Sequence, residues 1–307
     1  MRDHEVSAEV GQLTTTEQKT LFCNLNDVEN IDISSALDYV NAQMNNGVEL
    51  VLLLAPASTI DEIDALCETN EYNKALSATD KVVAYAISKN PLTELRDVQN
   101  STLGLSALFF DYNSTYYIVA SLIKGTTEAE CLQRTEQVSY IISETIDKSE
   151  YPGNAKWVFA LNMNAVSRID LEKYGRPYTD VEVDPEVGPT SELYAWQFAC
   201  HAPLLANNLT DCVAAQFMNY PYIATEARYD FLYASPMAWM AMLPLEIDKS
   251  ASYLSAGASL LQEDEDDGEG EGEGEGEGED EPIVIAPVQS GTPAVYPIIF
   301  TLKSEER

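Results

Sequence analysis

Val48–Leu54, with the sequence VELVLLL, is apolar at nearly every position. Such a run predicts a strand buried on both faces, which is typical of a central strand in a parallel or mixed sheet. Before it, residues 34–46 carry apolar side chains at helical spacing, and Gly47 stands where a helix C-cap is expected. After it, Ser58–Asp61 resembles a capping box at the start of a second helix. The stretch therefore indicates an α/β arrangement.

The same kinds of pattern continue to residue 163. Asp111–Ser114 is turn chemistry between two segments rich in strand formers, so a hairpin is expected there. Strands are expected at 81–87, 103–112, 116–123 and 156–163, and helices at 91–98 and 127–146. This order predicts an α/β fold with a layered mixed sheet flanked by helices.

Composition divides the rest of the chain into further segments. Residues 190–261 are aromatic and helical in pattern, whereas the alternation of glutamate and glycine near residue 270 cannot bury apolar surface. The expected division is an N-terminal arm or short edge strand (1–33), an α/β core (34–163), a connection (164–189), a helical aromatic-rich region (190–261), a disordered acidic Glu/Gly linker (262–281) and a C-terminal strand arm (282–307).

Acidic residues dominate the charge of the chain. It has 51 Asp and Glu against 17 Lys and Arg, a formal net charge of −34. Residues 263–281 contribute 13 acidic and no basic residues, so the remainder still holds 38 acidic against 17 basic. A surface this negative repels phosphates and anionic lipids. We therefore predict that the protein binds neither nucleic acid directly nor membranes.

Cysteine usage and the N-terminus bear on the compartment. No apolar run follows Met1–Glu5, so no secretory signal peptide is expected. The longest apolar stretches, 48–56 and 233–245, fall short of the roughly 20 residues that span a bilayer. An odd number of widely spaced cysteines predicts buried free thiols in a reducing cytoplasm: Cys23, Cys67, Cys131, Cys200 and Cys212.

No motif fixes a chemistry. The turn Ala55–Ser58 lacks the glycine and lysine of a phosphate-binding loop, and only His201 offers an imidazole outside the N-terminus. Cys200, His201 and Cys212 would give three zinc ligands without a fourth. Asp61, Glu62 and Asp64 fit the first turns of a helix, and the acidic residues at 180, 182, 184 and 186 fit a solvated connection. We therefore predict no catalytic, cofactor-binding or metal-binding residues and no cofactor.

The C-terminal segment looks like a docking arm. Two apolar, strand-like pieces follow the acidic tract, and such a strand can dock on its own domain or on a neighbour's sheet edge. A stripe of methionine and tryptophan near residue 240 suits a core or a subunit interface. The candidate interaction residues are Ile283, Val284, Ile285, Tyr296, Ile298, Phe300, Leu302, Trp239 and Met240.

One family resemblance accompanies these patterns. Gly47–Pro56 followed by Ser58–Ile63 resembles the core domain of contractile bacteriophage tail sheath proteins, and Tyr151–Phe159 resembles a later stretch of a divergent branch. The resemblance implies a non-enzymatic virion subunit whose terminal arms add strands to neighbours. Its partners would be copies of itself and other virion proteins, and its location the virion.

Three functions stay open at this point. The first is this structural assembly subunit. The second is an acidic inhibitor or nucleic-acid mimic that occupies a basic cleft on a host protein. The third is an α/β enzyme without a recognisable motif, whose ligand would lie at the strand ends near Ala55–Ser58 or Ser88–Pro91.

Overall fold

The computed structural model describes residues 15–28, 31–125, 127–148, 150–174, 195–222, 226–251 and 292–305. The expected acidic linker at 262–281, the segment Ile283–Ile285 and most of the expected connection at 164–189 lie outside these residues.

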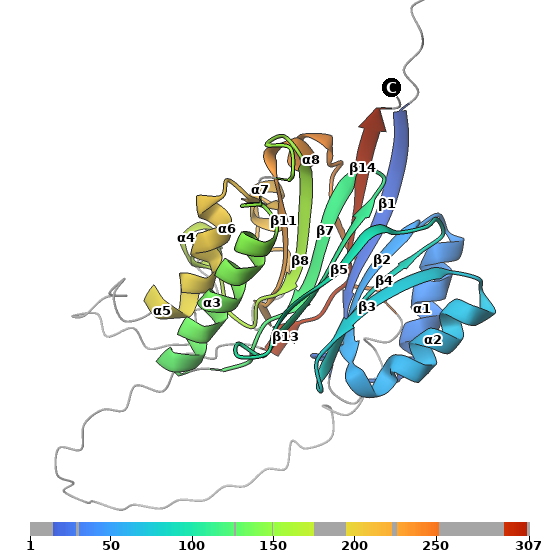
Figure 1. Cartoon of the computed structure of the whole chain (residues 1–307), viewed down its shortest axis with the longest axis horizontal. Coiled ribbons are helices and arrows are strands. Elements are labelled where there is room, and N and C mark those ends of the chain that lie inside the picture. Colours follow the sequence, from blue (N-terminus) through green and yellow to red (C-terminus); the bar gives the residue numbers. More distant parts are fainter. Residues whose placement is uncertain are drawn as a thin grey trace, which may run out of the picture.

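Two mixed sheets of six strands each pack face to face, with helices on the outer side of both (Figure 1). The first sheet runs in the order β12 (Glu246–Ile247), β14 (Ile298–Glu305), β1 (Thr15–Asn24), β2 (Leu50–Pro56), β4 (Val82–Ser88) and β3 (Asn73–Ala78). The second runs in the order β5 (Thr93–Asn100), β6 (Leu105–Tyr112), β7 (Thr115–Ser121), β8 (Lys156–Asn162), β11 (Asp230–Ala234) and β9 (Thr210–Asp211). β10 (Glu226–Arg228) and β13 (Thr292–Ala294) form a separate parallel pair.

The helices cover the two outer faces. α1 (Ile33–Asn45) and α2 (Ile60–Thr69) lie against the first sheet, and α3 (Glu128–Glu144), α5 (Ala195–Phe198) and α6 (Ala202–Ala206) lie outside the second (Figure 1). The other helices are α4 (Arg168–Tyr174), α7 (Cys212–Gln216) and α8 (Pro236–Ala241), with 3₁₀ turns η1 (Ala57–Thr59) and η3 (Ala199–His201). The predicted α/β class, with mixed sheets flanked by helices, is confirmed.

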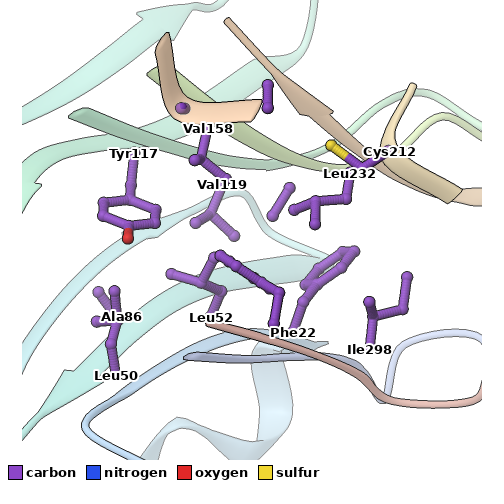
Figure 2. Packing of buried hydrophobic residues seen from close by; sticks show 14 of the residues in the cluster. Phe22, Leu50, Leu52, Ala86, Tyr117, Val119, Val158, Cys212, Leu232 and Ile298 are labelled. Carbon is purple, nitrogen blue, oxygen red and sulfur yellow. The ribbon is translucent and has the colours of Figure 1, made fainter. Parts of the chain in front are cut away.

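The apolar run in β2 is buried on both faces, as predicted. Leu50, Leu52 and Leu54 point into the core between the two sheets, where Figure 2 shows Leu52 beside Phe22 and opposite Val119. The alternate residues of β2, Val51 and Leu53, join a second core beneath α1 and α2. Because successive side chains of a strand point to opposite faces, only an uninterrupted apolar run can serve two cores at once.

Local patterns identified most elements but not all. The strands expected at 81–87, 103–112, 116–123 and 156–163 are β4, β6, β7 and β8, and the helix expected at 127–146 is α3, begun by a capping box at Thr127. The helix expected at 91–98 is instead β5, an edge strand paired with β6. Only Val98 of β5 is buried, so the strand lacks the alternation of apolar and polar residues that would predict it from the sequence.

The two terminal strands belong to one sheet. β1 lies between β14 and β2, so the N-terminal segment is an inner strand rather than an arm or an edge strand. β14 pairs antiparallel with β1 from Thr15↔Glu305 to Phe22↔Ile298. The C-terminal strand thus docks on its own domain. The expectation that it adds a strand to a neighbouring subunit is wrong, because its apolar face fills the core between this chain's own sheets.

Candidate functional site

Polar side chains meet at one end of the sandwich, where strands of both sheets end. Asn24 is the last residue of β1 in the first sheet, and Asn162 is the last residue of β8 in the second. β11 runs antiparallel to β8 and begins with Asp230, which pairs with Asn162. Asp27 follows β1 in the adjoining turn. Strand direction and the packing of the two sheets therefore bring residues more than 200 positions apart to one place.

Two amides bind two carboxylates there. The Nδ2 of Asn24 donates to Asp230 Oδ1 at 2.8 Å and to Asp27 Oδ2 at 2.9 Å. The Nδ2 of Asn162 donates to the same two oxygens, at 3.0 Å and 2.5 Å. We refer to these four residues and Lys124 as the strand-end cluster. Each carboxylate oxygen that faces the amides thus accepts two hydrogen bonds.

Lys124 supplies the positive charge of the strand-end cluster. It lies in the loop after β7, and its Nζ is 2.5 Å from Asp27 Oδ1. That oxygen is buried and accepts no hydrogen bond of good geometry within the described structure, so the ammonium is its partner there. The Lys124 side chain is 61% exposed whereas that of Asp27 is 4% exposed. The cation therefore lies between the buried carboxylates and solvent.

Asp230 is a buried carboxyl group with an altered acidity. Burial raises its pKa from 3.8 to about 8, and repulsion from Asp27 acts in the same direction. The hydrogen bonds from Asn24 and Asn162 and the charge of Lys124 oppose the rise without cancelling it. Asp230 consequently holds a proton near neutral pH, beside a second carboxyl group paired with a lysine. Strongly shifted groups of this kind are typical of catalytic sites.

A buried arginine fixes the two loops that carry the cluster. Arg134 of α3 is 2% exposed, and its guanidinium donates to the carbonyl oxygens of Ile123 (3.2 Å), Gly125 (2.5 Å) and Asn164 (2.5 Å). The Nδ2 of Asn164 also donates to Leu122 O at 2.7 Å. The loop of Lys124 is thereby held against the loop that follows Asn162.

Carboxylates are common ligands of divalent metal ions, so the fit of the donor set matters. No group of three or more His, Cys, Asp or Glu side chains in the described part of the chain could hold a metal ion. In the strand-end cluster the amide N–H groups point at the carboxylates, and an ammonium already contacts Asp27. Two unit charges about 4 Å apart interact by about 4 kcal/mol near a protein surface, and a dication beside the ammonium doubles that repulsion. As arranged, these residues do not fit a divalent metal.

The residues predicted to form interactions lie elsewhere. Ile298, Phe300 and Leu302 are buried in the core between the sheets, and Tyr296 stacks on Tyr222 with ring centroids 6.0 Å apart. Trp239 is partly buried against the same core. Met240 is 80% exposed on α8. None of them contributes to the strand-end cluster.

Sequence reasoning missed the cluster, although a signal was present. Asn24, Asn162 and Asp230 each stand directly at the end of an apolar strand, where a polar residue gains nothing from packing. The enzyme hypothesis placed a ligand near Ala55–Ser58, and this turn is close by, because Leu25 N donates to Leu54 O at 2.7 Å. Ser88–Pro91 lies at the opposite end, since β4 is antiparallel to β2.

Cys200, His201 and Cys212, the three possible zinc ligands of the sequence, are buried. All five cysteines are buried and none of them forms a disulfide bond, as predicted. His201 Nδ1 lies 2.7 Å from the Tyr233 hydroxyl and its Nε2 lies 3.0 Å from Val166 O. Because a carbonyl only accepts, Nε2 carries the proton and Nδ1 accepts from the tyrosine. Both ring nitrogens are used within the protein.

His201 should make the protein sensitive to mild acid. Burial lowers its pKa from 6.5 to about 4, so the neutral ring's contribution is complete above pH 6.5 and is lost as the pH falls through 4. The loss corresponds to about 3 kcal/mol. Between pH 7 and pH 4, urea unfolding should show the wild type losing about 3 kcal/mol relative to His201→Gln, which keeps one donor and one acceptor. The same change in both proteins would contradict the assignment.

Comparison with known proteins identifies the fold. No protein-family model and no curated protein matches the sequence. Among solved structures, an AP endonuclease from Archaeoglobus fulgidus is 11% identical with a TM-score of 0.55, over 94% of this chain and 100% of that one. The chain shares its fold with this endonuclease. The 3′ phosphatase NExo from Neisseria, bound to a product DNA hairpin, is 11% identical with a TM-score of 0.53, over 94% of this chain and 100% of that one. The AP endonuclease LMAP from Leishmania major is 10% identical with a TM-score of 0.55, over 94% of this chain and 88% of that one.

These neighbours overturn the functional predictions. They are nucleases and phosphatases rather than tail sheath proteins, so the resemblance based on Gly47–Ile63 and Tyr151–Phe159 is wrong. Short strand–loop–helix patterns recur in many α/β folds, which explains the error. The predictions of a non-enzymatic virion subunit, of virion partners and of no direct nucleic-acid contact are contradicted with it. At 10–11% identity the likeness establishes the fold alone.

No helix among the described residues is long and apolar enough to cross a membrane.

Proposed function

We propose that the chain hydrolyses phosphate esters of nucleic acid at the strand-end cluster. The observation that carries this proposal is that Asp230, whose pKa burial raises to about 8, shares two amide donors with Asp27, which is ion-paired to a partly exposed lysine. The neighbours in fold that are described as AP endonucleases and as a 3′ phosphatase support the same reaction class.

Each member of the cluster has a role in such a reaction. The Asp27 carboxylate takes a proton from the attacking water, whose oxygen forms the new bond to phosphorus. Asp230 gives its proton to the ester oxygen that leaves, so protons and charge balance. The Lys124 ammonium binds the non-bridging phosphate oxygens, where negative charge concentrates during the transfer. Asn24 and Asn162 fix the positions of the two carboxyl groups relative to each other through four hydrogen bonds.

The overall charge of −34 opposes the approach of a polyanion, so binding depends on the local charge of Lys124. Assays therefore belong at about 150 mM salt, where the screening length is about 8 Å.

The test is hydrolysis of three probes by the full chain: a duplex with an AP site, an oligonucleotide with a 3′-phosphate, and a small chromogenic phosphodiester. Each is assayed with Mg²⁺, with Mn²⁺ and with EDTA. We expect turnover of at least one probe that Asp27→Asn abolishes and that Asp80→Asn, a change at an exposed turn, leaves intact. Binding without turnover under every condition, or equal turnover by the two variants, would overturn the proposal.

A further inference from the structure

We propose that the Lys124 ammonium occupies, as a built-in cation, the position that a divalent metal ion would take between the carboxylates and the phosphate. The inference rests on the proposed function for the identity of the phosphate as substrate group. The position of the ammonium beside Asp27 can be tested without measuring hydrolysis.

The position of the ammonium is that of a metal ion in three respects. It contacts a carboxylate oxygen, Asp27 Oδ1, at 2.5 Å, and that buried oxygen accepts no hydrogen bond of good geometry from the described residues. It lies on the solvent side of a buried pair of carboxyl groups, with the Lys124 side chain 61% exposed. It brings positive charge to two acidic groups that would otherwise repel each other, as the effect of Asp27 on the pKa of Asp230 records.

While the ammonium occupies Asp27, the rest of the strand-end cluster offers a dication no strong ligand. The inner oxygens of both carboxyl groups accept from amide N–H groups, which leaves those oxygens without free lone pairs aimed at a common point. A protonated Asp230 is also a poor metal ligand, because metal binding to a carboxylate requires loss of its proton.

The loop that carries Lys124 is held in place. Arg134 binds the carbonyl oxygens of Ile123 and Gly125, the residues on either side of Lys124, and Ile123 N donates to Gln137 Oε1 at 2.9 Å. The side chains of Arg134 and Gln137 both come from α3 and are almost fully buried. The lysine thus projects from a loop that is fixed on both sides, which limits the positions that its ammonium can reach.

The test uses Mn²⁺ as the probe and reads the cluster directly. In the full chain labelled with ¹⁵N-asparagine, paramagnetic Mn²⁺ broadens most strongly the side-chain N–H₂ signals that lie nearest to it. Binding at the strand-end cluster is therefore read as broadening of the Asn24 and Asn162 signals in excess of that of the other labelled asparagines. We expect Lys124→Ala to show broadening at a Mn²⁺ concentration at least tenfold lower than the wild type, because it leaves Asp27 without its cation.

Lys81→Ala, at an exposed lysine, serves as the matched control and should behave as the wild type. Adding Asp27→Asn to Lys124→Ala should remove the gained binding. Equal broadening in the wild type and Lys124→Ala, or none in either, would overturn the inference. Since no outcome depends on hydrolysis, failure of this test and failure of the proposed function are separate results.

Discussion

Asp230→Asn is expected to stabilise the folded protein at pH 9 by up to about 5 kcal/mol while lowering hydrolysis by about 10²- to 10⁴-fold. The first effect follows from the cost of ionising a buried carboxyl group, which burial expresses as a pKa of about 8. Asparagine keeps an oxygen that accepts from Asn24 and Asn162 and has no charge to bury. The second effect follows because an amide has no proton to give to a leaving group.

The pH dependence distinguishes this from a general gain in stability. In the wild type the contribution of protonated Asp230 is complete below pH 3.8 and is lost as the pH rises towards 8, because the folded state holds a proton that the unfolded chain has released. Urea unfolding from pH 4 to pH 9 should therefore give curves for the wild type and Asp230→Asn that meet in acid and separate in base. Asp80→Asn should follow the wild type throughout. Parallel curves for the wild type and Asp230→Asn would show that the carboxyl group is not the buried acid described here.

The fold could be predicted where one element's own residues determine it. The uninterrupted apolar run of β2 predicts that its side chains enter two cores alternately. The turn residues between β6 and β7 predict their hairpin. β5 could not be predicted, because its neighbour β6 makes it a strand and its own side chains are mostly exposed. β11 lies in a region that seemed helical, and its place beside β8 depends on contacts 68 positions away in sequence.

The strand-end cluster could not be assembled from the sequence for a related reason. Asn24 and Asp230 each look like an ordinary polar residue beside a strand, and neither belongs to a local motif. They meet because β1 and β11 lie in different sheets and the sheets end at the same level. The raised pKa of Asp230 is likewise a property of burial by both sheets, which no spacing of residues expresses.

Arg228→Met is expected to lower the free energy of unfolding by about 3–5 kcal/mol. Arg228 is 1% exposed and binds two carboxylates with two edges of its guanidinium. Its Nε and Nη2 donate to Asp170 at 3.0 and 2.7 Å, and its Nη1 and Nη2 donate to Asp211 at 2.8 and 2.7 Å. Methionine of similar length fills the space but leaves two buried negative charges without a partner. At about 2–4 °C per kcal/mol for a domain of this size, the melting temperature should fall by roughly 10 °C.

A second variant separates charge from packing. Combining Arg228→Met with Asp170→Asn and Asp211→Asn removes both unpaired charges, and asparagine can still cap α7 as Asp211 does through Ala214 N. The triple variant should regain more than half of the loss, because breaking a buried ion pair costs far more than replacing it whole. If the triple variant is as unstable as Arg228→Met, packing around the guanidinium and not its charge holds α4 and α7 against the start of β11. The position of Asp230, two residues after Arg228, would then depend on shape alone.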